Sequence, residues 1–128
     1  MKMSINVIGA ATTKFGELWH KSLRDLIREA AISAIDDAGM KHKDIQAVYI
    51  GNMLSGMLSG QEQLGPMVTE ELGLNVPAFR TEGACASGGL AVYEAINSLL
   101  AGKFENVLVV GAEKMTDRTS ENVAMALM

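Results

Sequence analysis

Short apolar runs alternate along this chain with segments of helical periodicity, and this alternation constrains the fold more than any other feature. Strands are predicted at the mainly apolar runs of residues 5–11, 45–50 and 106–111, and a further short strand is predicted over residues 78–81. The first and fourth strands in chain order, and much of the second, are apolar on both faces, which is typical of strands buried between two layers of helices. The predicted element order is β-α-β-α-β-α-β. Right-handed crossovers then give an α/β fold, a layered α/β/α structure with a mainly parallel sheet.

The clearest helix is predicted between Ser22 and Gly39. Ser22 can cap its first turn, with Asp25 placed three residues later as in a capping box, and Gly39 is a natural stop. Apolar residues at three- and four-residue spacing form one stripe along it: Leu23, Leu26, Ile27, Ala30, Ala31, Ala34, Ile35 and Ala38. Further helices are predicted over residues 61–72 and 90–100. The segment between the second run and residue 61 is interpreted as a turn region or a helix start, and residues 113–128 give no firm prediction.

Length and composition limit the function classes. A chain of 128 residues has the size of one domain, and 48% hydrophobic residues suffice for a sizeable core. The net charge of −4 and the scattered lysines and arginines argue against a nucleic-acid partner. We read no secretory signal, and no apolar run approaches the ~20 residues that cross a bilayer, so we expect a soluble, cytoplasmic protein without a membrane partner.

Metal and nucleotide sites are not predicted. The single cysteine excludes an internal disulfide and a Cys-based zinc site, while His20 and His42 are far apart in sequence. The first run leads into Gly9 and the residues after it, but the further glycines of a dinucleotide fingerprint are missing there. Gly51 and Gly56 have the outer spacing of a phosphate loop, but Lys and Ser or Thr are missing after them. We therefore expect no metal and no bound cofactor.

The only cysteine, Cys85, lies in the sequence RTEGACASGG. It follows a predicted strand and precedes a predicted helix, whose first N–H groups and dipole would favour a thiolate. Its small neighbours would let a substrate approach closely. Gly88 and Gly89 each cost a helix about 1 kcal/mol relative to alanine, so we expect close packing of another segment there to offset this. A free cysteine is more often a small buried residue, and from these residues alone both interpretations stay open.

Residues 82–117, EGACASGGLAVYEAINSLLAGKFENVLVVGAEKMTD, resemble the amino-terminal half of a thiolase, an acetyl-CoA acetyltransferase, and are most similar to the archaeal and sterol-carrier-protein-type branch. The opening run, the Ser22 helix and the GNMLSG loop occur in the order expected of that family. The resemblance thus implies a thiolase N-terminal domain over residues 1–128, truncated so that the C-terminal half is absent. Ketoacyl synthases and hydroxymethylglutaryl-CoA synthases also place a cysteine at a helix start, but GACASGG and GAEKMTD favour thiolase.

The resemblance implies an acyl-CoA acyltransferase with Cys85 as the catalytic nucleophile. Cys85 would form an acyl-enzyme during condensation or cleavage of a 3-ketoacyl-CoA such as acetoacetyl-CoA, and its backbone N–H would contribute to an oxyanion hole. Coenzyme A thioester would then be a substrate rather than a cofactor. In the family a histidine and a second cysteine come from the second half, so we expect this fragment to be inactive alone. The alternatives are a non-catalytic thiolase-like assembly module and the N-terminal part of a ketoacyl or hydroxymethylglutaryl-CoA synthase.

Assembly with other protein is also implied. Thiolases dimerise by pairing the strand that corresponds to residues 78–81 across a two-fold axis, so we expect a homo-oligomer. The missing C-terminal half or a partner chain would cover apolar surface that a half-fold leaves exposed. A role in lipid metabolism follows from the same resemblance.

Overall fold

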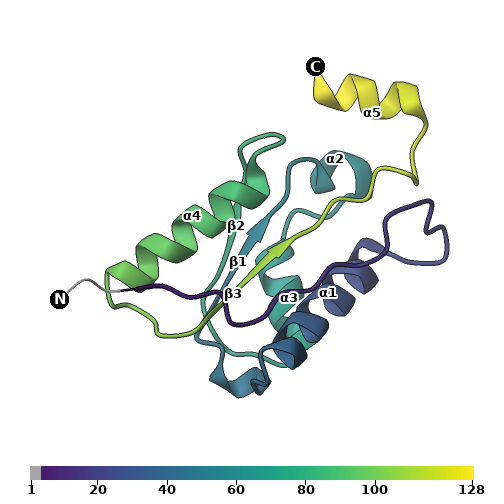
Figure 1. Cartoon of the computed structure of the whole chain (residues 1–128). Coiled ribbons are helices and arrows are strands. Elements are labelled where there is room, and N and C mark those ends of the chain that lie inside the picture. Colours follow the sequence, from purple (N-terminus) through teal and green to yellow (C-terminus); the bar gives the residue numbers. More distant parts are fainter. Residues whose placement is uncertain (1–3) are drawn as a thin grey trace.

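Three parallel strands form the centre of the molecule, and helices cover both faces of the sheet (Figure 1). The computed structural model describes residues 4–128. The strands are β1 (Ala47–Gly51), β2 (Ala78–Thr81) and β3 (Val107–Gly111), in the spatial order β2-β1-β3. The predicted layered α/β fold with a parallel sheet is therefore confirmed, and all the strands end at the same edge of the sheet.

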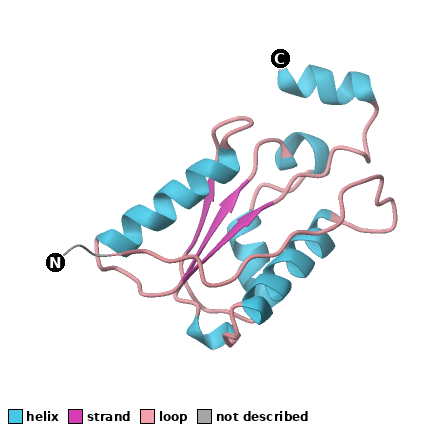
Figure 2. Cartoon of the chain, in the orientation of Figure 1, coloured by secondary structure: helices cyan, strands magenta, loops and turns pink. Residues whose placement is uncertain are grey.

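The helices lie in two layers. In chain order they are α1 (Leu23–Asp37), the short 3-10 helix η1 (His42–Asp44), α2 (Ser55–Ser59), α3 (Leu64–Leu72), α4 (Ser87–Leu100) and α5 (Ser120–Leu127). In Figure 2, α1 and α3 lie together on one side of the strands and α4 lies on the other. Within the described residues, no helix has the length and apolar character that crossing a lipid bilayer requires.

The two faces of the central strand pack against different helices. Alternate residues of a strand point to opposite faces. Val48 and Ile50 are fully buried in the cluster with α1 and α3, whose central members include Ile27, Leu64 and Val68. The intervening residues of β1, Ala47 and Tyr49, face α4. They form a smaller buried cluster with Ala91 and Ala95 of that helix. The prediction that this strand is buried on both faces is confirmed.

The predicted capping box of α1 is confirmed. The backbone N–H of Asp25 donates to Ser22 Oγ at 3.1 Å, and the N–H of Ser22 donates to Asp25 Oδ2 at 2.8 Å. Hydrogen bonds that the Asp25 carboxylate accepts from Ser22 lower the pKa of this exposed carboxyl below its ordinary value. The bond from the Ser22 backbone N–H has the larger effect, and the bond from the Ser22 hydroxyl has the smaller one. Gly39, with a φ of +65°, follows the end of the helix as expected.

The strand predicted over residues 5–11 is wrong. This segment forms no strand, and the side chains of Val7 and Ile8 are 88% and 58% exposed. It is held to the end of α1 instead, because the N–H of Ala10 donates to Asp37 Oδ2 at 2.9 Å. A cleft of about 650 Å³ lies between this segment and β3. A strand also needs hydrogen bonds to a neighbouring strand, and an apolar sequence pattern alone does not show whether they form. The order of elements in the structure therefore begins with α1.

Smaller differences concern the helix ends. The helices predicted over residues 61–72 and 90–100 are confirmed as α3 and α4, which begin at Leu64 and Ser87. The segment interpreted as a turn or helix start contains the short helix α2. The helix α5 occupies a stretch for which no element is predicted from the sequence.

Candidate functional site

Cys85 lies in the turn between β2 and α4, at the edge where all the strands end. Its side chain is exposed, so the interpretation of Cys85 as a residue sealed in the core does not hold for the described chain. The position that the sequence predicted, after a strand and before a helix, is confirmed. An exposed thiol at this place is accessible to a reactant from solvent.

The turn that carries Cys85 has an unusual backbone conformation. Ala84 has a φ of +50°, and among the described residues it is the only non-glycine residue with a positive φ. Side chains disfavour this left-handed region, and such residues persist only where their surroundings hold them. Here the N–H of Ala84 donates to Glu82 Oε1 at 2.6 Å, and the N–H of Ala86 donates to the carbonyl of Gly83 at 3.0 Å.

A buried serine completes this turn. Ser87 Oγ accepts a hydrogen bond from the N–H of Gly83 at 3.0 Å and donates one to the carbonyl of Ala84 at 2.6 Å. The backbone carbonyl of Ser87 accepts a further hydrogen bond from the hydroxyl of Thr81 at 3.3 Å. The N–H of Cys85 finds no acceptor within residues 4–128. The turn therefore presents both the thiol and a free backbone donor.

Two glycines allow α4 to approach the sheet, and two others leave space. A Cβ on Gly51 would lie 2.5 Å from the carbonyl oxygen of Ser87, so only glycine fits where β1 meets the start of α4. A Cβ on Gly83 would lie 2.1 Å from Leu90 Cδ1. A Cβ on Gly88 or Gly89 would meet no atom within 4 Å. The expected close packing is found for the backbone of Gly88, since a Cβ on Gly51 would lie 2.7 Å from Gly88 Cα, but no segment lies against the side-chain positions of Gly88 and Gly89 among the described residues.

A buried polar network joins the strand ends, and the sequence interpretation missed it. Asn52, which is 1% exposed, donates from Nδ2 to the carbonyl of Ala112 at 2.8 Å and to Glu113 Oε1 at 3.0 Å. Its Oδ1 accepts from Arg80 Nη2 at 3.1 Å. Glu113 Oε2 accepts from the N–H of Met53 at 2.9 Å. The available signal was a polar residue within each of these three strands or one or two positions after it, since parallel strands bring such residues to one edge.

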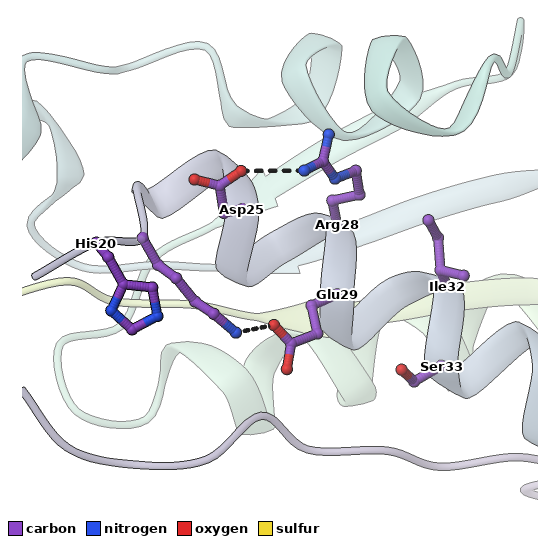
Figure 3. A pocket seen from close by; sticks show the side chains of 7 residues that line it. His20, Asp25, Arg28, Glu29, Ile32 and Ser33 are labelled. Atoms are coloured by element: carbon purple, nitrogen blue, oxygen red, sulfur yellow. Dashed lines mark hydrogen bonds and ion pairs between the residues drawn. The ribbon is translucent and has the colours of Figure 1, made fainter. Parts of the chain in front are cut away.

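Neither histidine belongs to the Cys85 turn. His20 lines a hollow at the start of α1 (Figure 3), where the Lys21–Glu29 ion pair lies beside a pair between Arg28 and Asp25 of 3.1 Å. His42 hydrogen-bonds through Nδ1 to the carbonyl of Leu72 at 2.9 Å, at the end of α3. Both histidines thus lie with the α1–α3 layer, whereas Cys85 precedes α4 on the opposite side of the sheet. Residues 4–128 contain no cluster of three or more His, Cys, Asp or Glu side chains that could hold a metal ion.

Comparison with known proteins identifies relatives over nearly the whole chain. The family described as "Thiolase, N-terminal domain" matches residues 5–126. An acetyl-CoA acetyltransferase of Methanocaldococcus jannaschii is 47% identical over 114 residues, which are 88% of this chain and 29% of that protein. An acetyl-CoA acetyltransferase of Methanothermobacter thermautotrophicus is 44% identical over 123 residues, which are 95% of this chain and 32% of that protein. Both relatives are archaeal, in agreement with the branch that the sequence predicted.

The fold is also shared with a solved structure. The acetyl-CoA acetyltransferase of Syntrophomonas wolfei superposes with a TM-score of 0.64 at 24% identity, over 77% of this chain and 26% of that one. The chain therefore spans less than a third of the length of each of these three proteins.

Proposed function

Since this chain belongs to the family of thiolase N-terminal domains, we propose that it carries the acyl-accepting cysteine of a coenzyme A acyltransferase. The observation that supports this most is the exposed Cys85 thiol on a strained turn at the amino end of α4. Two relatives at 47% and 44% identity bear the name acetyl-CoA acetyltransferase, which favours acetyl-CoA and acetoacetyl-CoA as substrates. Coenzyme A thioester is a substrate in this proposal, and no resident cofactor takes part.

The proposed first step is acyl transfer to Cys85. Its Sγ attacks the thioester carbonyl, the bond between the carbonyl carbon and the sulfur of coenzyme A breaks, and the coenzyme A thiolate leaves. The backbone N–H of Cys85, which has no acceptor among the described residues, can donate to the oxyanion that forms in between. A second acyl-CoA, deprotonated at its α-carbon, then attacks the enzyme thioester to give a 3-ketoacyl-CoA. The reverse sequence cleaves that product.

The base that removes the proton of the thiol and of the α-carbon is proposed to come from outside these 128 residues. His20 lines a hollow at the start of α1 and His42 hydrogen-bonds at the end of α3, and neither lies at the Cys85 turn. The outer face of α4 exposes apolar side chains that a further protein segment would cover: Leu90, Val92, Tyr93, Ile96 and Leu100. We therefore expect a C-terminal half or a partner chain to complete the site, and the 128-residue chain alone to catalyse no turnover.

Acylation of Cys85 tests this function directly. The chain is incubated with acetyl-CoA, alone and with the C-terminal remainder of a related thiolase, and the intact and digested protein are weighed by mass spectrometry. We expect one acetyl group on the peptide that contains Cys85, and none on the Cys85→Ser variant. Absence of this adduct even when the C-terminal part is supplied would contradict the proposal.

Assembly is a second candidate role, favoured by the position of β2. This strand lies at one edge of the sheet, and Phe79 on it is 45% exposed while stacking on Tyr49 with ring centroids 5.1 Å apart. We propose that two copies pair through β2 to form a homo-oligomer. Light scattering on the chain at several concentrations tests this, and a mass of one protomer at every concentration contradicts it. If assembly is the sole function, Cys85→Ser leaves the activity of the assembled enzyme unchanged.

A further inference from the structure

We propose that Ser87 is a positioning residue that fixes the direction of the Cys85 backbone N–H and thereby the acyl-binding geometry at Cys85. The inference rests on the proposed acyl transfer, and it assigns a role to a side chain that neither the sequence nor the family match singles out.

The hydroxyl of Ser87 contacts the turn on both sides of the strained residue. It donates to the carbonyl of Ala84 at 2.6 Å and accepts from the N–H of Gly83 at 3.0 Å. The carbonyl of Ala84 and the N–H of Cys85 belong to the same planar trans peptide, so they point in opposite directions. A hydrogen bond that fixes the carbonyl therefore also fixes the direction in which Cys85 donates.

The strain at Ala84 explains why this peptide needs a partner. With a φ of +50°, Ala84 occupies a region that alanine disfavours, and rotation of the following peptide would relieve the strain. Such a rotation turns the Cys85 N–H away from its present direction. The Glu82 carboxylate holds only the preceding peptide, through the N–H of Ala84 at 2.6 Å. Ser87 holds the peptide that matters for Cys85 with two donors to the Ala84 carbonyl, its hydroxyl at 2.6 Å and its backbone N–H at 3.1 Å, and substitution removes only the shorter of these bonds.

Ser87 is itself anchored, which a positioning group requires. It is 5% exposed, and its carbonyl accepts from the hydroxyl of Thr81 at 3.3 Å. The absence of a side chain at Gly51 lets the Ser87 backbone lie directly on the end of β1. The contacts that connect the central strand to Ser87, and Ser87 to the Ala84 carbonyl, therefore leave this peptide little freedom to move.

The same helix contains a matched control. Ser98 is 7% exposed, and its Oγ donates to the carbonyl of Ala95 at 2.8 Å, three residues earlier, as Ser87 does to Ala84. Ser87→Ala and Ser98→Ala thus remove the same atom from a buried site with the same type of hydrogen bond. Only Ser87 also contacts the Cys85 turn.

The test compares these two variants with the parent chain by three measurements. Amide exchange of Gly83 followed by NMR reports the turn, the rate of Cys85 alkylation by iodoacetamide reports the accessible thiol, and the rate of acylation by acetyl-CoA reports the aligned site. In Ser87→Ala we expect faster exchange of Gly83 and acylation slower by about tenfold or more, with alkylation changed less than about threefold. In Ser98→Ala we expect all three rates to match the parent.

Several results would overturn the inference. These are unchanged Gly83 exchange in Ser87→Ala, an equal loss of acylation in Ser98→Ala, or alkylation that falls as far as acylation does. If the parent chain is not acylated at all, even with the C-terminal remainder of a related thiolase supplied, the proposed function fails and the acyl-positioning role of Ser87 fails with it. The exchange rate of the Gly83 amide still decides whether Ser87 holds the turn.

Discussion

The two faces of the sheet differ in what covers them. On the face of α1 and α3, large aliphatic side chains such as Ile27 and Leu64 are fully buried, and Arg24 of α1 pairs with Glu71 of α3 at 2.5 Å. On the face of α4, the buried contacts are made mainly by small alanines, and the outer side of the helix remains apolar and exposed. The first face therefore holds most of the buried core, whereas the second leaves apolar surface exposed, which fits the proposal that a further protein segment covers it.

The largest expected effect is a difference in stability loss when one apolar side chain is truncated on each face of the sheet. Ile27→Ala removes a fully buried side chain between α1 and the sheet and should lower the free energy of unfolding by about 2–5 kcal/mol. Ile96→Ala on α4 removes a side chain that is already 37% exposed and should cost about 1 kcal/mol or less. Urea unfolding of both variants measures this. Equal losses would show that the α4 face stabilises the domain as much as the other face does.

The next effect concerns the contact of α4 with β1. Gly51→Ala places a Cβ 2.5 Å from the Ser87 carbonyl oxygen, so α4 must shift, and we expect a loss of about 1–3 kcal/mol by thermal or urea unfolding. Gly111 is the matched control, because it pairs with Gly51 in the adjacent strand and has no atom within 4 Å of an added Cβ. Gly111→Ala should be close to neutral. A tolerated Gly51→Ala would mean that the start of α4 is loosely seated.

A gain of stability is expected on the open side of the same helix. Gly89→Ala replaces a poor helix former where an added Cβ meets nothing within 4 Å, so stability should rise by about 0.5–1 kcal/mol. If the open space receives the thioester, the same methyl group should slow acylation of Cys85. Melting temperature and acylation rate together test this. Faster or unchanged acylation would show that the substrate approaches from another side.

The smallest effect concerns pH and the α1 cap. The capping hydrogen bonds lower the pKa of Asp25, so its stabilising contribution is present above about pH 4 and is lost as the pH falls through the lowered pKa of the folded state. The stability difference between the parent and Asp25→Asn should therefore shrink between pH 7 and about pH 3. Urea midpoints at both pH values measure it. A difference that does not depend on pH would show that the carboxylate charge is irrelevant to the cap.

The sequence predicted those parts of the fold that local chemistry determines. The Ser22 capping box, the apolar stripe of α1 and the turn position of Cys85 each follow from residue types at short spacing, and each is confirmed. The strand at residues 5–11 is wrong because strand formation depends on a distant neighbour that periodicity does not reveal. The positive φ of Ala84 and the Asn52–Glu113 contact, which spans 61 positions, also depend on tertiary structure. No local pattern reports them.

The hydrogen bonds of Asn52 have a consequence for how the strand ends open. Its side chain contacts residues that follow β3, and it accepts from Arg80 of β2 while its own backbone continues β1. Fraying at this edge is therefore coupled, because detaching β2 or β3 breaks a hydrogen bond to Asn52, and detaching the end of β1 breaks hydrogen bonds to both neighbours. Amide exchange in this region should occur in a single cooperative opening, with similar opening free energies at all three strand ends. We therefore expect this edge of the sheet to open as one unit, without partly frayed states.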